Sequence, residues 1–215
     1  MLKSSNSDLV PKTSAIDIFP WDDNFNTGLA KVDEQHRRLV ELLNLLASHV
    51  AFQTDIPQLR KIFDELSDYA VYHFQTEEAI WHVFFADDPS ESEHREKHAS
   101  FISEIERLKA EQATKSDAQV LEETLDFLGR WLASHILESD RYMAYTVLAL
   151  QEGMPLDQAK LRAKQQMEGA TRTLIDIILL AYATLSANTL RLMRELAEHR
   201  QAKIELIRES ERNQA

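Results

Sequence analysis

Apolar side chains recur at helical spacing along most of this 215-residue chain. Residues three and four apart lie on one face of an α-helix, so such a pattern predicts an amphipathic helix with one buried face. One pattern covers residues 32–53, and similar patterns cover about 57–85, 92–112 and 117–150. The apolar positions of the first are Val32, Leu39, Leu42, Leu43, Leu46 and Val50. We therefore expect four helices before residue 152.

Short polar connections separate these predicted helices. The segment 86-ADDPSES-92, for example, combines turn residues with residues that cap helix N-termini. Helices joined by short loops pack as antiparallel neighbours. With only 4 glycines and 5 prolines, the sequence predicts an all-α protein with an up-down-up-down four-helix bundle over residues 18–152. A flexible segment over 1–17 precedes it, and Trp21 and Phe25 are candidate anchors of an N-terminal arm.

The C-terminal segment, residues 153–215, has a different pattern. Gly153 and Pro155 predict a stop and a restart, followed by one long helix over about 156–212. Apolar a and d positions with one asparagine are typical of a parallel two-stranded coiled coil, so we expect a homodimer through this helix. Glu195 and His199 interrupt the seam, which leaves the alternative of a fifth helix folded back on the bundle. The heptad positions are Leu174, Ala181 and Asn188, and Ile178, Leu185, Leu192, His199 and Leu206.

Charge and composition narrow the classes of partner. The formal net charge of −12 argues against a nucleic-acid partner. The absence of cysteine excludes disulfides, thiolate zinc sites and iron–sulfur clusters. The N-terminus has no apolar signal-peptide core, and the longest apolar run, near residues 174–185, is too short to span a bilayer and contains Asp176. We therefore expect a cytoplasmic protein with no membrane partner.

Histidines gather on the predicted inner faces. The chain has eight, and five of them share a helix face with apolar residues. A single histidine in such a place is usually a hydrogen-bonded interior residue. Five on four helices favour a metal site, because buried imidazoles need partners and commonly bind metal ions. The five are His36, His73, His94, His98 and His135.

Two carboxylates accompany these histidines. Glu77 follows His73 by four residues and therefore lies on the same helix face. Asp140 follows His135 by five, which in ideal α-geometry rotates the chain by about 140°. Asp140 is therefore either a surface residue or part of a local π-helical widening, a feature frequent at functional sites. Five imidazoles and two carboxylates suit two metal ions better than one, with room for a small exogenous ligand.

These motifs resemble those of one family. The ordered set of His36, 73-HFQTE-77, 94-HREKH-98 and 135-HILESD-140 resembles the hemerythrin family, and 33-DEQHRRLVELLN-44 with the upstream Trp21 is similar to its bacterial members. The resemblance covers about residues 18–150. It implies a non-haem di-iron centre, with two iron ions (Fe2+/Fe3+) joined by an oxo or hydroxo bridge, that binds O2 at one iron.

The resemblance also implies a role for each position. His94, His98 and His135 would hold one iron, and His36 and His73 the iron with the open position. Glu77 and Asp140 would bridge the two ions. NO or small anions are further candidate ligands there. Leu137 matches the family's apolar cover over bound O2, and Trp131, one turn before His135, is our own candidate for the pocket wall. His82 matches no ligand, and we expect it at the surface.

The C-terminal helix suggests the function. It is similar to signalling helices that join bacterial input domains to output domains, so we expect a non-enzymatic O2 or redox sensor module with a covalently linked output domain, such as a diguanylate cyclase that makes cyclic-di-GMP. A stand-alone O2 carrier or storage protein is the alternative. A ferritin-like di-iron oxidase is the second, because Glu91 and His94 fit a Glu-x-x-His pair and Asp33 and His36 approximate one.

Overall fold

The computed structural model describes residues 17–51, 56–111, 115 and 117–213, so nearly all of the predicted N-terminal segment over 1–17 lies outside the described residues. The described part is almost entirely helical and contains no strand. The first three bundle helices are α1 (Ala30–Ala51), α2 (Ile56–Phe85) and α3 (Pro89–Glu111). The fourth is continuous but contains three parts: α4 (Asp117–Ser134), the π-helical turn η2 (His135–Asp140) and α5 (Arg141–Gln151).

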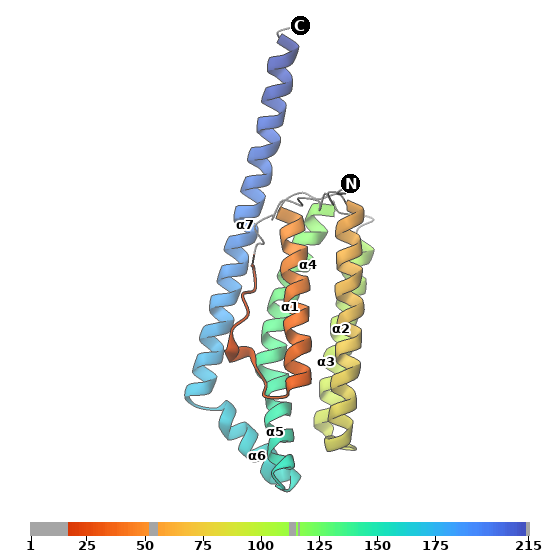
Figure 1. The fold of residues 1–215 in the computed structure, drawn as a ribbon, viewed down its shortest axis with the longest axis vertical. Helices are drawn as coiled ribbons and strands as arrows, with labels where there is room; N and C mark the ends of the chain where they lie inside the picture. The colour runs from red at the N-terminus through yellow and green to blue at the C-terminus, as the bar shows by residue number, and fades with distance from the viewer. Residues whose placement is uncertain (1–16, 52–55, 112–114, 116, 214–215) are drawn as a thin grey trace, which may run out of the picture.

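These helices form an up-down-up-down bundle (Figure 1). α1 contacts both α2 and α4, and α3 contacts the same two helices, which closes the ring. The all-α bundle predicted from apolar spacing is confirmed. Antiparallel packing follows from the short connections, because links of three to five residues do not allow the chain to cross the bundle before the next helix begins.

The bundle interior has three layers. A large apolar cluster fills one end, where residues such as Leu43, Leu66 and Leu128 from three helices meet. A smaller apolar cluster around Trp81 and Phe85 fills the other end. Between the two lies a layer of buried histidines and carboxylates. The apolar layers exclude water from this polar layer on both sides and hold the four helices at fixed distances.

The N-terminal arm covers the side of the bundle and ends at α1. It contains one turn of 3-10 helix, η1 (Asp23–Phe25), and Phe25 is fully buried, as expected for an anchor. The Asp33 carboxylate accepts hydrogen bonds from the backbone N–H and the hydroxyl of Thr27, at 2.6 and 2.8 Å, and from the backbone N–H of Gly28. Gly28 has φ +94°, and a Cβ there would lie 3.2 Å from Leu148 Cδ1. These contacts fix the start of the helix that carries His36.

The C-terminal segment is two helices, so the prediction of one helix over 156–212 is wrong. α6 (Leu156–Met167) ends at Glu168, and α7 (Ala170–Asn213) begins after Gly169. Gly169 has φ +65°, a left-handed conformation that ends helices and that glycine adopts at little cost. The two helices are bent by 58° at this break. α6 packs on α5, and α7 returns along the bundle beside α4 and α1 (Figure 1).

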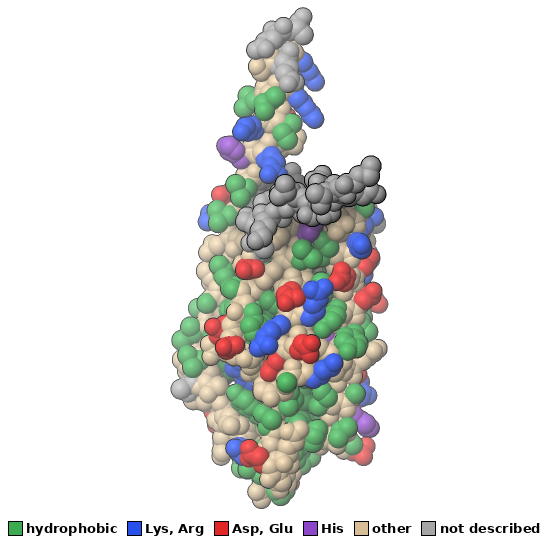
Figure 2. Space-filling view, in the orientation of Figure 1, with side chains coloured by type: hydrophobic (Ala, Val, Ile, Leu, Met, Phe, Trp, Pro, Cys, Tyr) green, Lys and Arg blue, Asp and Glu red, His purple; other side chains and the backbone are tan. Residues whose placement is uncertain are grey.

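α7 has two apolar faces. One face docks on the bundle through buried Ile175 and partly buried Ile178, Leu179 and Tyr182. The other stays exposed and includes most of the predicted heptad positions, for example Leu185. The C-terminal part of α7 extends past the bundle and carries apolar and basic side chains (Figure 2). The predicted alternative of a helix folded back on the bundle therefore describes the first part of α7, but not the whole helix.

Among the described helices, none is by itself long and apolar enough to cross a membrane. The bent pair formed by α6 and residues 171–189 meets that test only when the two are taken together, by length and composition.

Candidate metal centre

All four bundle helices contribute to the buried polar layer. His36 comes from α1, His73 and Glu77 from α2, His94 and His98 from α3, and His135 and Asp140 from η2. Each of these seven side chains is at most 5% exposed. The structure therefore brings together all the side chains that the sequence singled out as candidate metal ligands.

The π-helical turn places the last two residues. Asp140 is fully buried, so the possibility that it is a surface residue is wrong. The backbone N–H of Arg141 donates to the carbonyl of Ile136, five residues earlier, as well as to Glu138. A five-residue hydrogen bond widens the helix by one residue. This widening brings Asp140 Oδ1 to 3.1 Å from His135 Nε2, although the two residues are five apart in the chain.

The Asp140 carboxylate faces both halves of the layer. Its Oδ2 lies 3.2 Å from His36 Nε2, whereas its Oδ1 lies 3.3 Å from His94 Nε2 and next to His135. Each carboxylate oxygen thus faces a different set of histidines. A carboxylate in this position offers an oxygen to each half of the layer.

Glu77 lies between the same two halves. Its Oε1 is 3.6 Å from His36 Nε2, and its Oε2 is 3.6 Å from both His73 Nε2 and His94 Nε2 and 3.3 Å from His98 Nε2. Two sets of donor atoms result, within each of which all the atoms lie within 4.8 Å of one another. Glu77 belongs to both. The sets are Glu77, His94, His98 and His135, and His36, His73, Glu77 and Asp140.

Most of these donor atoms make no hydrogen bond, which is the observation that tests whether the site fits metal ions. Both oxygens of Glu77 and of Asp140, both ring nitrogens of His36 and Nε2 of His94 are buried without a hydrogen-bond partner. Leaving such atoms unpaired costs about 1–3 kcal/mol each. Imidazole nitrogens and carboxylate oxygens are good iron ligands. The donor set therefore fits a pair of metal ions.

Without metal, burial and the neighbouring charged groups shift the pKa values of these side chains, and the two effects oppose each other. Burial lowers the pKa of His36, but the adjacent Asp140 and Glu77 carboxylates outweigh it and raise the pKa to about 9. Burial lowers the pKa of His73 to about 4, and it also lowers that of His135. Burial raises the pKa values of Glu77 and Asp140, but the surrounding histidines bring both below their usual range. The carboxylates are therefore ionised, as metal ligation requires.

Two residues that the sequence did not single out hold the histidine rings. Gln35 Oε1 lies 3.1 Å from His73 Nδ1, and Glu78 Oε1 lies 3.1 Å from His98 Nδ1. Each ring then donates from Nδ1, which leaves the Nε2 lone pair free for a metal ion. Gln35 directly precedes the candidate ligand His36, and Glu78 directly follows Glu77. This adjacency is the only feature of the sequence that could have pointed to their role. One ring has a neutral amide partner and the other a carboxylate.

Aromatic rings pack against the layer from one side. The Trp131 ring stacks on His135 with centroids 4.1 Å apart, and the Phe74 ring stacks on His98 at 3.9 Å. Trp131 also lines an apolar cavity of about 20 Å³, together with eight apolar neighbours from all four bundle helices. Leu137 is fully buried but is not among the residues that line this cavity.

The remaining polar candidates point elsewhere. His82 is exposed, as expected, and lies 2.9 Å from Glu91. Glu91 also pairs with Arg95, at 3.0 Å, on the surface of α3. Asp33 is bonded to the N-terminal arm. Neither Glu91 nor Asp33 therefore joins the buried layer, so the Glu-x-x-His pairs that favoured a ferritin-like oxidase do not form a site.

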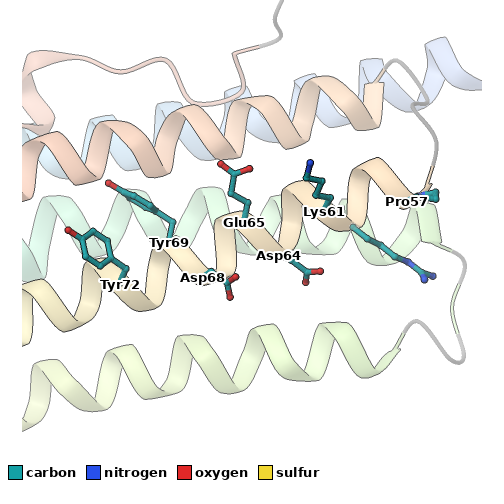
Figure 3. Close-up of a pocket in the computed structure, with 8 residues that line it drawn as sticks. Pro57, Lys61, Asp64, Glu65, Asp68, Tyr69 and Tyr72 are labelled. Atoms are coloured by element: carbon teal, nitrogen blue, oxygen red, sulfur yellow. The ribbon is translucent and has the colours of Figure 1, made fainter.

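A surface hollow on α2 is also unrelated to this layer. It has a volume of about 960 Å³ and is lined by residues between Pro57 and Tyr72 (Figure 3). Ion pairs from neighbouring helices already engage two of its acids, with Arg38 on Glu65 and Lys109 on Asp64, both at 2.9 Å. The bundle interior remains the place where polar groups converge.

Four antiparallel helices surround two adjoining histidine–carboxylate groups, each of which could hold a metal ion. The sequence profile described as the hemerythrin HHE cation binding domain matches residues 27–146. The chain belongs to the hemerythrin family, whose members bind O2 at non-haem iron. The profile ends within α5, so α6 and α7 lie outside it.

Individual relatives agree with this family membership. A bacteriohemerythrin from Clostridium acetobutylicum is 32% identical over 132 residues, which are 58% of this chain and 97% of that protein. One from Stenotrophomonas maltophilia is 34% identical over 134 residues, 61% of this chain and 83% of that protein. A hemerythrin-like protein from Naegleria gruberi is 32% identical over 123 residues, 57% of this chain and 87% of that protein.

Proposed function

We propose that the chain is the O2- or redox-sensing input module of a signalling protein, with a di-iron centre in its bundle and α7 as the element that carries the signal. The observation that carries this proposal is that α7 packs on α4, the helix that continues directly into the ligand-bearing turn η2. A cyclic-di-GMP-synthesising domain, a diguanylate cyclase, is our first candidate for a linked output domain.

In the proposed site, His94, His98 and His135 would hold one iron, and His36 and His73 would hold the other, where O2, NO or a small anion would bind. Glu77 and Asp140 would serve both irons, because each has oxygens that face both sets of histidines. When bound, the two irons supply reversible O2 binding and redox change. An oxo or hydroxo bridge between them belongs to the same proposal.

The chain's own residues prepare this site. Gln35 and Glu78 accept from Nδ1 of His73 and His98, which favours the tautomer whose Nε2 carries the lone pair. The apolar layers above and below exclude water. Trp131 and its cavity offer an apolar space to a small uncharged gas, and Leu137 adds a buried apolar side chain in the same turn as His135. No residue of the layer is placed to act on a larger substrate, so we propose a binding protein and not an enzyme.

We further propose that α7 pairs in parallel with α7 of a second copy. Its outward face carries large apolar side chains that the bundle leaves uncovered: Leu174 is 58% exposed, Leu185 41% and Leu192 51%. Asn188 is exposed on the same face, where an asparagine favours a parallel two-stranded register. Residues 198–210 of α7 are all exposed, and this part of the helix extends beyond the described bundle helices in Figure 1.

Sedimentation of the full chain tests the dimer. We expect a dimer for the wild-type chain and a monomer for the double variant Leu185→Glu/Leu192→Glu, whereas Leu161→Glu on exposed α6 should leave the dimer intact. A monomeric wild-type chain would favour the second candidate, a stand-alone O2 carrier or storage protein. The docking of Ile175 and Tyr182 on the bundle supports that candidate.

Hydrogen exchange tests the sensor role. We expect backbone amides over residues 141–190 to exchange at different rates in the diferrous and diferric forms, because η2 lies between α4 and α5 and both contact the C-terminal helices. Identical exchange in the two forms would contradict a signalling role while leaving O2 binding unaffected.

A further inference from the structure

The ligand-bearing turn has a direct contact with α7. Glu138 is the outward-facing residue of η2, and its Oε1 lies 2.7 Å from Arg172 Nη1 in the first turn of α7. The other Glu138 oxygen accepts a hydrogen bond from the Ser134 hydroxyl at 2.9 Å. Ser134 precedes His135 directly, so Glu138 links the residue before the first ligand of this turn to α7.

Arg172 is held in place from the other side as well. Its second terminal nitrogen, Nη2, lies 2.9 Å from Asp176 Oδ1, one turn further along α7. The planar guanidinium therefore spans two carboxylates, one on η2 and one on α7. Arginine is suited to this role, because its fixed fork of donors sets the relative orientation of two acceptors, unlike the single ammonium of lysine.

One other polar side chain, that of Ser139, connects η2 to a neighbouring helix. Ile136 and Leu137 point into the core. Ser139 accepts a hydrogen bond from Lys97 Nζ at 2.7 Å, which ties η2 to α3. The two polar residues of η2 that are not candidate ligands, Glu138 and Ser139, are thus held by α7 and by α3. The α3 contact lies within the part of the chain that the family profile matches, whereas Arg172 lies outside it.

We propose that Arg172 is a positioning residue of the metal centre, which acts through Glu138 on the turn that carries His135 and Asp140. The inference rests on the proposed function in one respect, namely that these two residues ligate iron. Because coupling between two sites is reciprocal, the same contact makes the position of α7 respond to the geometry of that turn. α7 is then a regulatory part of the centre, in addition to being an extension of the bundle.

The expected effect is modest and salt-dependent. Glu138 is 33% and Arg172 51% exposed, so water and salt screen the pair. Exposed ion pairs contribute little free energy, and loss of this one should change O2 affinity by roughly two- to fivefold. High salt should move the affinity of the wild-type chain toward that of a chain that lacks the pair.

The test compares Arg172→Gln with Arg191→Gln in the full chain. Arg191 is a matched control, because it is an exposed arginine of α7 whose ion-pair partner, Glu195, lies four residues later in the same helix. Three readouts are taken: iron per chain, O2 half-saturation at low and high salt, and amide exchange of residues 134–141 in the metal-free protein. The charge-exchanged variant Glu138→Arg/Arg172→Glu tests rescue.

We expect Arg172→Gln to shift the O2 half-saturation point at low salt and to accelerate amide exchange over residues 134–141. Arg191→Gln should behave like the wild type in both measurements. The charge-exchanged variant should lie closer to the wild type than Arg172→Gln does. Equal affinity and equal exchange in Arg172→Gln and Arg191→Gln would overturn the inference. If Arg172→Gln fails to fold, an O2 affinity of the wild-type chain that does not change with salt would overturn it. A wild-type chain that binds no iron contradicts the proposed function instead, and the metal-free exchange comparison still decides this inference.

Discussion

His135 and Asp140 are five residues apart in the chain, and their side chains nevertheless meet, with Asp140 Oδ1 3.1 Å from His135 Nε2. A regular α-helix would turn Asp140 away from the bundle interior by about 140° from His135. The π-helical turn removes this difference and gives the fourth helix two inward-facing donors. The position of Asp140 between His36 and His135 depends on that one local departure from α-geometry.

Asp140→Asn tests whether this carboxylate is needed for metal binding. The substitution keeps the size of the side chain but removes its charge and one of its two acceptor oxygens. We expect fewer irons per chain than in the wild type, with unchanged helix content by circular dichroism, because the apolar layers still hold the bundle. Asp126→Asn, on the exposed face of α4, is the control. Full iron content in Asp140→Asn would show that Asp140 is not a ligand.

His98→Ala and His82→Ala form a second matched pair. His98 is buried, bonded to Glu78, and its Nε2 lies 3.0 Å from His135 Nε2. His82 is an exposed histidine of α2. We expect His98→Ala to lower the iron content of the protein. Loss of iron should be its main effect, and the O2 affinity of any protein that still holds both irons should change less. His82→Ala should change neither the iron content nor the O2 affinity. Equal iron content in the two variants, measured by metal analysis, would exclude His98 from the ligand set.

Tyr182 should anchor α7 to the bundle. Its ring lies 4.6 Å from Phe19 and 5.1 Å from Phe25, and its hydroxyl donates to the Pro20 carbonyl. We expect Tyr182→Ala to lower the free energy of unfolding by about 1–2 kcal/mol, as loss of two aromatic contacts implies, and to increase proteolysis within α7. Tyr182→Phe keeps the ring and should be affected less. Equal urea midpoints and equal proteolysis in Tyr182→Ala and the wild type would show that the arm does not hold α7.

The ion pair between Asp88 and Lys160 predicts a pH-dependent contribution to stability. Burial raises the pKa of Asp88, but hydrogen bonds from Lys160 Nζ, at 2.8 Å, and from Ser90 bring it below its usual range. A carboxyl group with a lowered pKa in the folded state stabilises the protein above its unfolded pKa, and this stabilisation is lost as pH falls through the folded pKa. The pair joins the turn before α3 to α6.

Lys160→Gln should therefore lower the free energy of unfolding by about 0.5–1 kcal/mol at pH 7. The difference from the wild type should narrow as pH falls from 5 to 3, because protonation of Asp88 removes the pair in the wild type too. Urea denaturation at several pH values measures this. A difference that is as large at pH 3 as at pH 7 would show that Lys160 acts through packing and not through its charge.

The sequence predicted the bundle well because burial sets the helical pattern. Positions such as Leu39, Leu43 and Leu66 are buried for the same reason that they recur at helical spacing. The seven polar residues of the centre were found because charged and imidazole groups are rare on such faces. Asp140 was ambiguous, because spacing alone cannot distinguish a π-helical turn from an outward-facing residue.

The C-terminal segment was predicted less well. The break at Glu168–Gly169 was missed, because one glycine in a polar helical stretch is a weak stop signal. The docking of α7 was offered only as an alternative, because α7 has two apolar faces that share Ile178. A heptad pattern identifies the outward face, but the inward face at Ile175, Leu179 and Tyr182 has a partner only in three dimensions. Gln35 and Glu78 were missed because a polar neighbour of a ligand is not unusual in sequence.

The docked start of α7 gives the rest of the helix the geometry of a lever arm. α7 contains 44 residues, and its N-terminal part, as far as Tyr182, packs on the bundle and the N-terminal arm. The remainder, from Ala183 to Asn213, is about 46 Å long at 1.5 Å per residue. A tilt of the docked part by about 5° would displace Asn213 by roughly 4 Å. A small adjustment where α7 meets the bundle would therefore become a displacement of several ångströms at the far end of the helix.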